Sequence, residues 1–388
     1  MRGAVCFGLG LLLVLCGCKA KDDVVPPVDT EIHPPELPDC EVLWRVDAGF
    51  AWNNFEASSP LQPLVQERQI ISWALRGRAL TDVQAVHRAT GAVLWRFSHQ
   101  HLYRMGGGRF AHSNGQLYVP EWTEANRATL RAISDSSGEV SWATRLDLHE
   151  PQELTADAVA VYGYEQHGDS VWLVAIDSAS GSRLADVDLS GYEVIFGPIT
   201  TDAGVVVFTR RAVLLFGPST LIPLGEFPQE HDLSDRYMPL PMADRFRAVF
   251  VENGDLVALD LGNGEIQEFT RWNHEERFGV VYEDAYWGAW TDGAEGQGFH
   301  SISLNDGTEA RYTYDWLPVD MGAELAVAPD RVARWGSESG VYIFDIDSGA
   351  PLCHWEDEGQ FLNHLVPIIA DGMLYVPGEE ELFALRLP

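Results

Sequence analysis

The stretch VQAVHRATGAVLWRF, from Val83 to Phe97, consists of an apolar alternation, a short polar turn that ends at Gly91, and a second alternation. Stretches of the same form begin at four further places along the chain. They read LRAISDSSGEVSWATRL from Leu130, LVAIDSASGSRL from Leu173, LVALDLGNGEIQEF from Leu256 and VYIFDIDSGAPLCHW from Val341. A unit that returns at regular intervals predicts a repeat architecture rather than a series of unrelated domains.

Each unit predicts two antiparallel strands joined by a tight turn. In the copy that begins at Leu173, successive residues point alternately to two sides, and both sides are apolar, as in a strand buried on both faces. The carboxylate of Asp177 can accept hydrogen bonds from the amides of the turn, and Gly181 supplies the positive φ that a short hairpin with a bulge requires. The unit therefore reads as a hairpin.

A tryptophan follows the turn glycine at a fixed distance in two of the units. Trp95 lies four residues after Gly91, and Trp142 lies four residues after Gly138. Trp44, in CEVLWRV, belongs to a strand of the same kind. A tryptophan that recurs in one register indicates a packing wedge between repeats rather than a platform for a ligand.

Eight such units can be counted, and each is preceded by further strand-like runs, so that a unit contains four strands. Four strands per repeat is the number found in a blade of a β-propeller. The last unit, LFALRLP, stops after its third strand, whereas CEVLWRV near the start of the chain is a fourth strand with no unit before it. Joining the two halves closes the ring. The units start near Val83, Leu130, Leu173, Val213, Leu256, His300, Val341 and Leu382.

The consensus L-x-A-x-D-x-x-x-G-x-x-x-W resembles the PQQ-like (pyrroloquinoline quinone-like) β-propeller repeat, from residue 40 to the end of the chain. A lipid-anchored, single-domain propeller of eight blades is similar to the BamB family of outer-membrane β-barrel assembly factors. The resemblance implies an all-β fold and a role in binding other envelope proteins. The unit around AVLLFGPSTLIPLGEF departs from the pattern, because it lacks both the aspartate and the tryptophan.

The amino-terminal region predicts export and lipid attachment. Residues 1–17 combine one basic residue with a short apolar run, as in a secretory signal peptide. The junction LCGC resembles a bacterial lipoprotein signal, in which Cys18 is acylated and becomes the first residue. Residues 18–39 are acidic and proline-rich and read as a flexible tether. Lys19 is not the aspartate that retains enterobacterial lipoproteins in the inner membrane, so we expect an outer-membrane anchor facing the periplasm.

The chain is strongly acidic, with 26 basic and 58 acidic residues and a formal net charge of -32. Such a surface repels the phosphates of nucleic acids and anionic lipid headgroups, so we expect no nucleic acid partner and membrane contact through the lipid anchor only. The acidity itself is typical of a highly soluble surface.

Two cysteines remain once the signal peptide and the acylated residue are set aside. Cys40 and Cys353 both fall on outermost strands, one at the start of the strand that completes the eighth blade and one in the seventh blade. An even pair in an exported chain favours a disulfide. The outer strands of neighbouring blades diverge, however, and the bond needs the two α carbons within about 7 Å. The sequence leaves both the disulfide and two free thiols open.

No constellation typical of catalysis, metal binding or cofactor binding was found in the sequence. His99 and His101 lack a third ligand, and HEER from His274 lacks the second histidine of a zinc-binding helix. DIDSG at Asp345 begins like a calcium loop but stands where the other units have a structural turn. We therefore expect no cofactor and a noncatalytic scaffold, with a PQQ-binding quinoprotein or another small-ligand-binding propeller as the alternative.

Two loops are candidates for partner binding. EHDLSDRYMPLP lies between the fourth and fifth units. In the BamB family, an aspartate-bearing loop of similar sequence helps to contact the barrel-assembly protein. The resemblance implies that Asp235, with Arg236 and Tyr237 beside it, contacts the β-barrel assembly machinery. The long aromatic hairpin YWGAWTDGAEGQGF offers Trp287 and Trp290, which either face a partner or are buried between blades.

Overall fold

The computed structural model describes most of the chain from residue 35 onward. The described ranges are 35–47, 63–76, 80–98, 111–124, 127–147, 154–230, 233, 242–243, 246–252, 255–271, 279–292, 296–317, 321–336, 340–356, 367–377 and 381–388. These residues contain 32 β-strands and no helix. The strands form eight antiparallel sheets of four strands each, which we number as blades 1 to 8.

The first four blades follow one another along the chain. Blade 1 contains β2 (Leu64–Val65), β3 (Gln69–Arg76), β4 (Leu80–His87) and β5 (Val93–Ser98). Blade 2 contains β6 (Ala111–Ser113), β7 (Gln116–Glu124), β8 (Arg127–Ser134) and β9 (Val140–Leu146). Blade 3 contains β10 (Thr155–Ala156), β11 (Ala160–His167), β12 (Ser170–Asp177) and β13 (Arg183–Asp188). Blade 4 contains β14 (Val194–Thr201), β15 (Gly204–Thr209), β16 (Ala212–Phe216) and β17 (Pro223–Pro228).

The other four blades complete the ring. Blade 5 contains β18 (Met242–Ala243), β19 (Arg247–Glu252), β20 (Asp255–Asp260) and β21 (Ile266–Arg271). Blade 6 contains β22 (Gly279–Tyr282), β23 (Ala285–Asp292), β24 (Gly296–Ser303) and β25 (Glu309–Tyr314). Blade 7 contains β26 (Met321–Ala328), β27 (Arg331–Gly336), β28 (Gly340–Asp345) and β29 (Pro351–Trp355). Blade 8 contains β30 (Ile368–Ala370), β31 (Met373–Pro377), β32 (Glu381–Arg386) and β1 (Glu41–Asp47).

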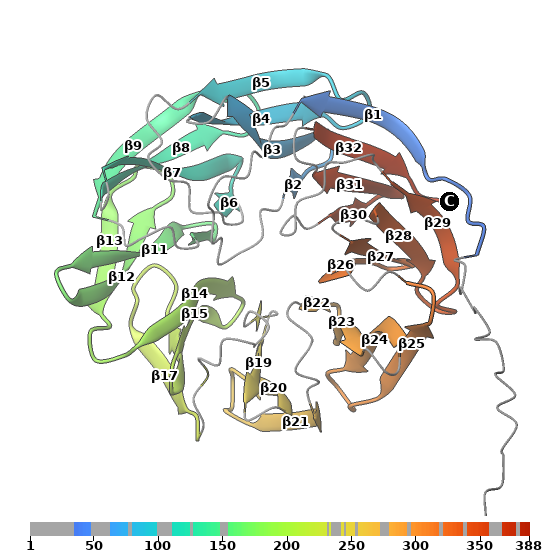
Figure 1. Ribbon diagram of the computed structural model, residues 1–388. Coiled ribbons are helices and arrows are strands. Elements are labelled where there is room, and N and C mark those ends of the chain that lie inside the picture. The colour runs from blue at the N-terminus through green and yellow to red at the C-terminus, as the bar shows by residue number, and fades with distance from the viewer. Residues whose placement is uncertain are drawn as a thin grey trace, which may run out of the picture. The chain divides into compact units, whose positions relative to one another are not determined.

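The eight blades are arranged in a ring, with the first strand of each blade toward the centre and the fourth at the rim (Figure 1). Blade 8 has the order β30-β31-β32-β1, so its outermost strand comes from the other end of the chain. β1 pairs antiparallel with β32, from Glu41 opposite Arg386 to Asp47 opposite Glu381. The predicted eight-bladed propeller and its split blade are both confirmed.

The core of the ring lies between blades, because each sheet buries both of its faces. In β15, Val205 and Val207 pack in a cluster shared with blade 3, whereas Val206 and Phe208 pack in a cluster shared with blade 5. All four side chains are fully buried. Because burying one such side chain stabilises a fold by about 1.5–3 kcal/mol, alternating apolar residues hold every blade to both of its neighbours.

A short amino-terminal segment, which we call the strap (residues 35–40), crosses the outer edge of blade 7 before β1 begins. Asp39 forms a parallel bridge with His354 of β29, and the amide of Cys40 donates to the carbonyl of His354 at 2.9 Å. Leu37 packs against the aromatic cluster between blades 6 and 7. Residues 35–39, which the sequence analysis included in the expected tether, thus contact blades 6 and 7 in the structure.

A disulfide joins the strap to blade 7. Cys40 and Cys353 are bonded, with their α carbons 5.3 Å apart and a sequence separation of 313. Both side chains are buried, and they pack with Trp355 and Phe383. The divergence of neighbouring outer strands does not keep the two cysteines apart, because the strap lies directly along the edge of β29.

Candidate functional site

Of the five partner-binding residues predicted from the sequence, Trp287 alone has a side chain that the structure describes. Asp235, Arg236 and Tyr237 lie outside the described residues, as does Cys18. Trp290 belongs to β23, but its side chain is outside the description. Trp287 is only 7 % exposed and packs in the cluster between blades 6 and 7. Trp287 is therefore a core residue and is not available to a partner, because β23 is an inner strand of its blade.

The repeated tryptophans connect blades 8, 1 and 2 to the blades that follow them in the ring. Trp44, Trp95 and Trp142 each lie on an outermost strand and donate their indole N–H to a backbone carbonyl in the turn of the following blade. The acceptors are Arg88 at 2.9 Å, Asp135 at 2.7 Å and Ser178 at 3.0 Å. Each acceptor stands three residues before the turn glycine. The tryptophans are wedges, and they act across blades rather than within one.

The turn glycines are the sockets for these rings. Gly91, Gly138 and Gly181 have φ of 68°, 73° and 73°, a backbone conformation that residues with a Cβ rarely adopt. A Cβ on Gly138 would also lie 2.8 Å from Cε3 of Trp95, and one on Gly91 would lie 2.8 Å from Cε3 of Trp44. The glycine is required twice, once by the backbone and once by the neighbouring indole.

Other junctions use other aromatic rings, or none. Tyr312 contacts Gly349 and donates its hydroxyl to the carbonyl of Ile346 at 2.9 Å, so it replaces the indole in both respects. Phe227 and Phe269 lie against Gly264 and Gly307. Between blades 3 and 4 the residues are reversed in size: Ala185 stands at the tryptophan position, and Leu221 stands at the glycine position with φ of 51°.

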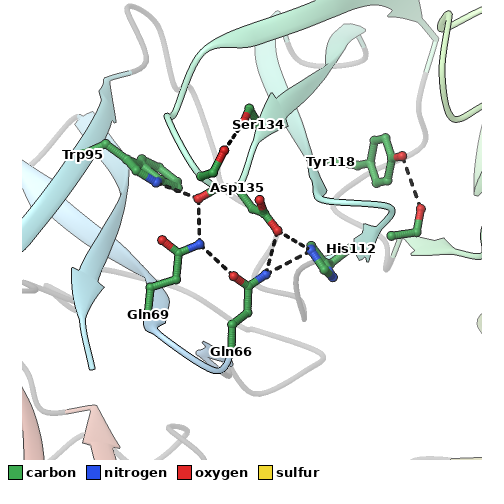
Figure 2. Close-up of polar contacts among 9 residues, drawn as sticks. Gln66, Gln69, Trp95, His112, Tyr118, Ser134 and Asp135 are labelled. Atoms are coloured by element: carbon green, nitrogen blue, oxygen red, sulfur yellow. Dashed lines mark hydrogen bonds and ion pairs between the residues drawn. The ribbon is translucent and has the colours of Figure 1, made fainter. Parts of the chain in front are cut away.

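A polar cluster joins blades 1 and 2 (Figure 2). The amide Nε2 of Gln66 donates to Oδ2 of Asp135 at 2.9 Å, and Nε2 of His112 lies 2.9 Å from the same oxygen. Nε2 of Gln69 donates to the side-chain Oε1 of Gln66 and to the backbone carbonyl of Asp135, both at 2.7 Å. Trp95 donates to the same Asp135 backbone carbonyl. The carboxylate and the imidazole are about one-quarter exposed or less, at 16 % and 26 %.

This cluster was missed by the sequence reasoning. Its members come from different strands and turns of two blades, and their positions in the sequence do not have the spacing of a ligand-binding motif. One signal was available: Asp135 occupies the turn position at which blade 1 has Arg88 and blade 3 has Ser178, and such variation in a repeat marks a site-specific contact. The groups bond to one another and to Trp95, so the arrangement holds two blades in register.

The junction between blades 8 and 1 is also polar. The guanidinium of Arg88 donates to the hydroxyl of Tyr375 at 2.7 Å, to the Asp371 carboxylate at 2.5 Å and to the carbonyl of Ala370 at 2.9 Å. Burial raises the pKa of the Tyr375 hydroxyl, and the hydrogen bond from Arg88 opposes that rise. Because blade 8 contains both chain ends, these bonds help to hold the closed ring together.

The turn aspartates cap their turns as the sequence indicated. Oδ1 of Asp177 accepts from the amides of Ala179 and Ser180, and Oδ1 of Asp345 accepts from the amide and hydroxyl of Ser348. These bonds from the serines hold the pKa of both carboxyl groups below its usual range. The turn at Asp345, which begins like a calcium loop, thus has the same geometry as its counterpart in blade 3.

Two further findings concern the described residues only. No three His, Cys, Asp or Glu side chains among them gather closely enough to hold a metal ion. They also include no helix of the length and hydrophobicity needed to span a membrane.

Eight four-stranded blades, a ring closed by the pairing of β1 with β32 and aromatic wedges seated on turn glycines define the fold of the protein: it is an eight-bladed β-propeller. Residues 80–184 match the family described as outer membrane protein assembly factor BamB. The fold is similar to that of BamB from Moraxella catarrhalis, at 12 % identity and a TM-score of 0.62, over 89 % of this chain and 97 % of that one. The predicted resemblance to BamB is confirmed in fold. No curated protein sequence matches the chain.

The same fold is shared by proteins of other kinds. A quinohemoprotein alcohol dehydrogenase from Comamonas testosteroni matches with 12 % identity and a TM-score of 0.59, over 90 % of this chain and 78 % of that one. The computationally designed protein Ika8 matches with 14 % identity and a TM-score of 0.63, over 86 % and 97 %. The fold alone therefore does not choose between a scaffold and an oxidoreductase.

Proposed function

We propose that this protein is an envelope lipoprotein whose propeller is a noncatalytic scaffold for other envelope proteins, in a role similar to that of BamB in outer-membrane β-barrel assembly. The observation that carries the proposal is the conjunction of a lipoprotein signal at Cys18, a proline-rich tether and a single propeller similar in fold to BamB. A rigid ring on a tether holds its loops at a membrane surface and leaves them free to meet partners.

The lipid anchor is the first part of the proposal that can be tested. Replacement of Cys18 by serine removes the thiol that is acylated, so we expect the protein to lose its lipid and its normal processing, and therefore to keep the mass of its uncleaved signal peptide. Intact mass measurement of both forms checks this result. Cys6→Ser, within the signal peptide, is the matched control and should leave the lipidated mass unchanged. A native mature protein without lipid would contradict the proposal.

The partner is tested through the loop between blades 4 and 5. Asp235→Arg reverses a charge at the position that resembles the BamB contact, so we expect it to reduce copurification of the β-barrel assembly protein by about tenfold without changing the melting temperature. Asp169→Arg, on an exposed turn between β11 and β12, is the control and should copurify like the wild type. Equal copurification by all three proteins would rule out a BamB-like interface at Asp235.

The similarity to the quinohemoprotein alcohol dehydrogenase supports an alternative function, a PQQ-dependent oxidoreductase. Such enzymes hold a metal ion beside the quinone, and the described residues contain no cluster of three acidic, histidine or cysteine side chains that could hold one. Addition of PQQ and calcium to the purified protein distinguishes the two functions. A scaffold gains neither a quinone absorption band nor dye-linked dehydrogenase activity.

A further inference from the structure

The turn between β16 and β17 in blade 4 differs from its counterparts in charge. It reads GPSTLI, from Gly217 to Ile222, and contains no ionisable side chain. In the other six described turns between the third and fourth strands of a blade, at least one charged residue is present. These are Arg88, Asp135, Asp177, Asp260, Asp306 and Asp345. In a chain of net charge -32, blade 4 therefore has a locally uncharged turn.

The same turn exposes apolar side chains that the fold does not need. Leu221 is 3 % exposed and fills the junction with blade 3, opposite Ala185 and Val187. Ile222, directly after it, is 61 % exposed, more than any other large apolar side chain of the described residues. Leu224 is 57 % exposed. Since packing is complete at Leu221, the exposed aliphatic groups beyond it are free for another contact.

A hydrogen-bond chain brings an apolar residue of blade 3 to this turn. The amide of Ser219 donates to the hydroxyl of Tyr162 at 2.9 Å, and that hydroxyl donates to Oδ2 of Asp157 at 2.6 Å. Oδ1 of Asp157 in turn accepts from the amide of Val159, which is 51 % exposed. We call Val159, Pro218, Ile222 and Leu224 the blade 4 patch.

Carboxylates surround the blade 4 patch. Asp157 shares a turn with Val159, and Asp177 begins the turn whose next amide donates to the carbonyl of Val159. Asp202 lies in the turn between β14 and β15, near Gly204, and a Cβ on Gly204 would meet the carbonyl oxygen of Phe216, the residue before the turn of the patch. Glu226 follows on β17 and accepts from Tyr192 at 3.0 Å. An apolar centre with an acidic border is complementary to an apolar side chain flanked by basic ones.

We propose that the blade 4 patch is a docking site for a partner segment in which a large apolar residue is flanked by lysine or arginine. The apolar residue covers Ile222 and Leu224, and the flanking cations meet the surrounding carboxylates. This inference rests on the proposed scaffold function, because it identifies a surface that the scaffold uses for a partner.

The test uses a defined probe, a fluorescein-labelled nine-residue peptide with a central tryptophan and two lysines on each side. Fluorescence anisotropy measures its binding to the full chain. We expect Ile222→Ser with Leu224→Ser to weaken binding by about tenfold or more. The matched control is Val93→Ser with Leu94→Ser, on β5 of blade 1. Those residues are 46 % and 49 % exposed, but they follow a turn that contains Arg88 and belong to another blade, so binding should be unchanged.

Two altered peptides separate the apolar and ionic parts of the site. Replacement of the tryptophan by serine, or of the lysines by glutamate, should each abolish measurable binding. Equal binding of the serine peptide, equal weakening by both protein variants, or no binding of the original peptide would overturn the inference. None of these outcomes depends on lipidation or on copurification of an assembly protein, so the proposed function can stand or fail separately.

Discussion

Replacement of Gly138 by alanine is expected to lower the free energy of unfolding by about 2–5 kcal/mol. A positive φ costs an alanine about 1–2 kcal/mol, and forcing an atom into a packed contact costs about 1–3 kcal/mol more. Here the new Cβ meets the Trp95 ring at 2.8 Å, and that ring is 8 % exposed, so it cannot move into solvent without losing its own burial. Urea denaturation followed by tryptophan fluorescence measures the change.

Gly372 is the matched control for this prediction. It has nearly the same backbone conformation, with φ of 71°, but no atom lies within 4 Å of the position of a Cβ. Gly372→Ala should therefore cost only the conformational part, about 1–2 kcal/mol. In a Trp95→Ala background, the effect of Gly138→Ala should fall to the same value. Equal losses at Gly138 and Gly372 in the wild-type background would show that the indole is not a wedge.

Removal of the disulfide is expected to have an effect of similar size. A bond that closes a loop of 313 residues restricts the unfolded chain, and the chain-entropy model gives about 6 kcal/mol for that length, from which strain in the folded protein subtracts. We expect Cys40→Ala with Cys353→Ala to lower the free energy of unfolding by about 3–5 kcal/mol. The double variant keeps the β1 to β32 pairing, so the ring should still form, but its unfolding should begin at the seam between blades 7 and 8.

Two measurements check the disulfide prediction. Urea denaturation gives the stability, and hydrogen exchange should show faster opening of β1 and β32 than of the strands in blade 3. The reduced wild-type protein is the control and should match the double variant. Two free thiols found by alkylation of the denatured, unreduced protein, or equal stability of all forms, would contradict the expectation.

Local sequence patterns were sufficient to predict the architecture. Each hairpin depends on residues close together in the chain, such as Asp177 and Gly181, so the repeat, the number of blades and the split blade could be predicted. The residue that each wedge tryptophan contacts could not be predicted, because Trp95 packs against Gly138, which belongs to the next unit. The repeat shows only that both residues recur.

The remaining differences have the same physical origin. The polar cluster of Gln66, His112 and Asp135 joins two blades, and the strap pairs with β29 although more than 300 residues separate them. A proline-rich composition predicts a tether, and it does not indicate which few residues at its end are held by pairing. Trp287 was a candidate for exposure because its hairpin is long and aromatic, yet its place on β23 buries it.

The strap has a mechanical consequence. Any tension applied to the chain before residue 35 reaches Cys40 before it reaches β1, and at Cys40 a covalent bond transfers the load to β29 in blade 7. The hydrogen bonds between β1 and β32, which a direct pull would break one after another from the end at Glu41, are thus shielded from the force. Force applied to the amino-terminal end is therefore transmitted to blade 7 and does not separate β1 from β32.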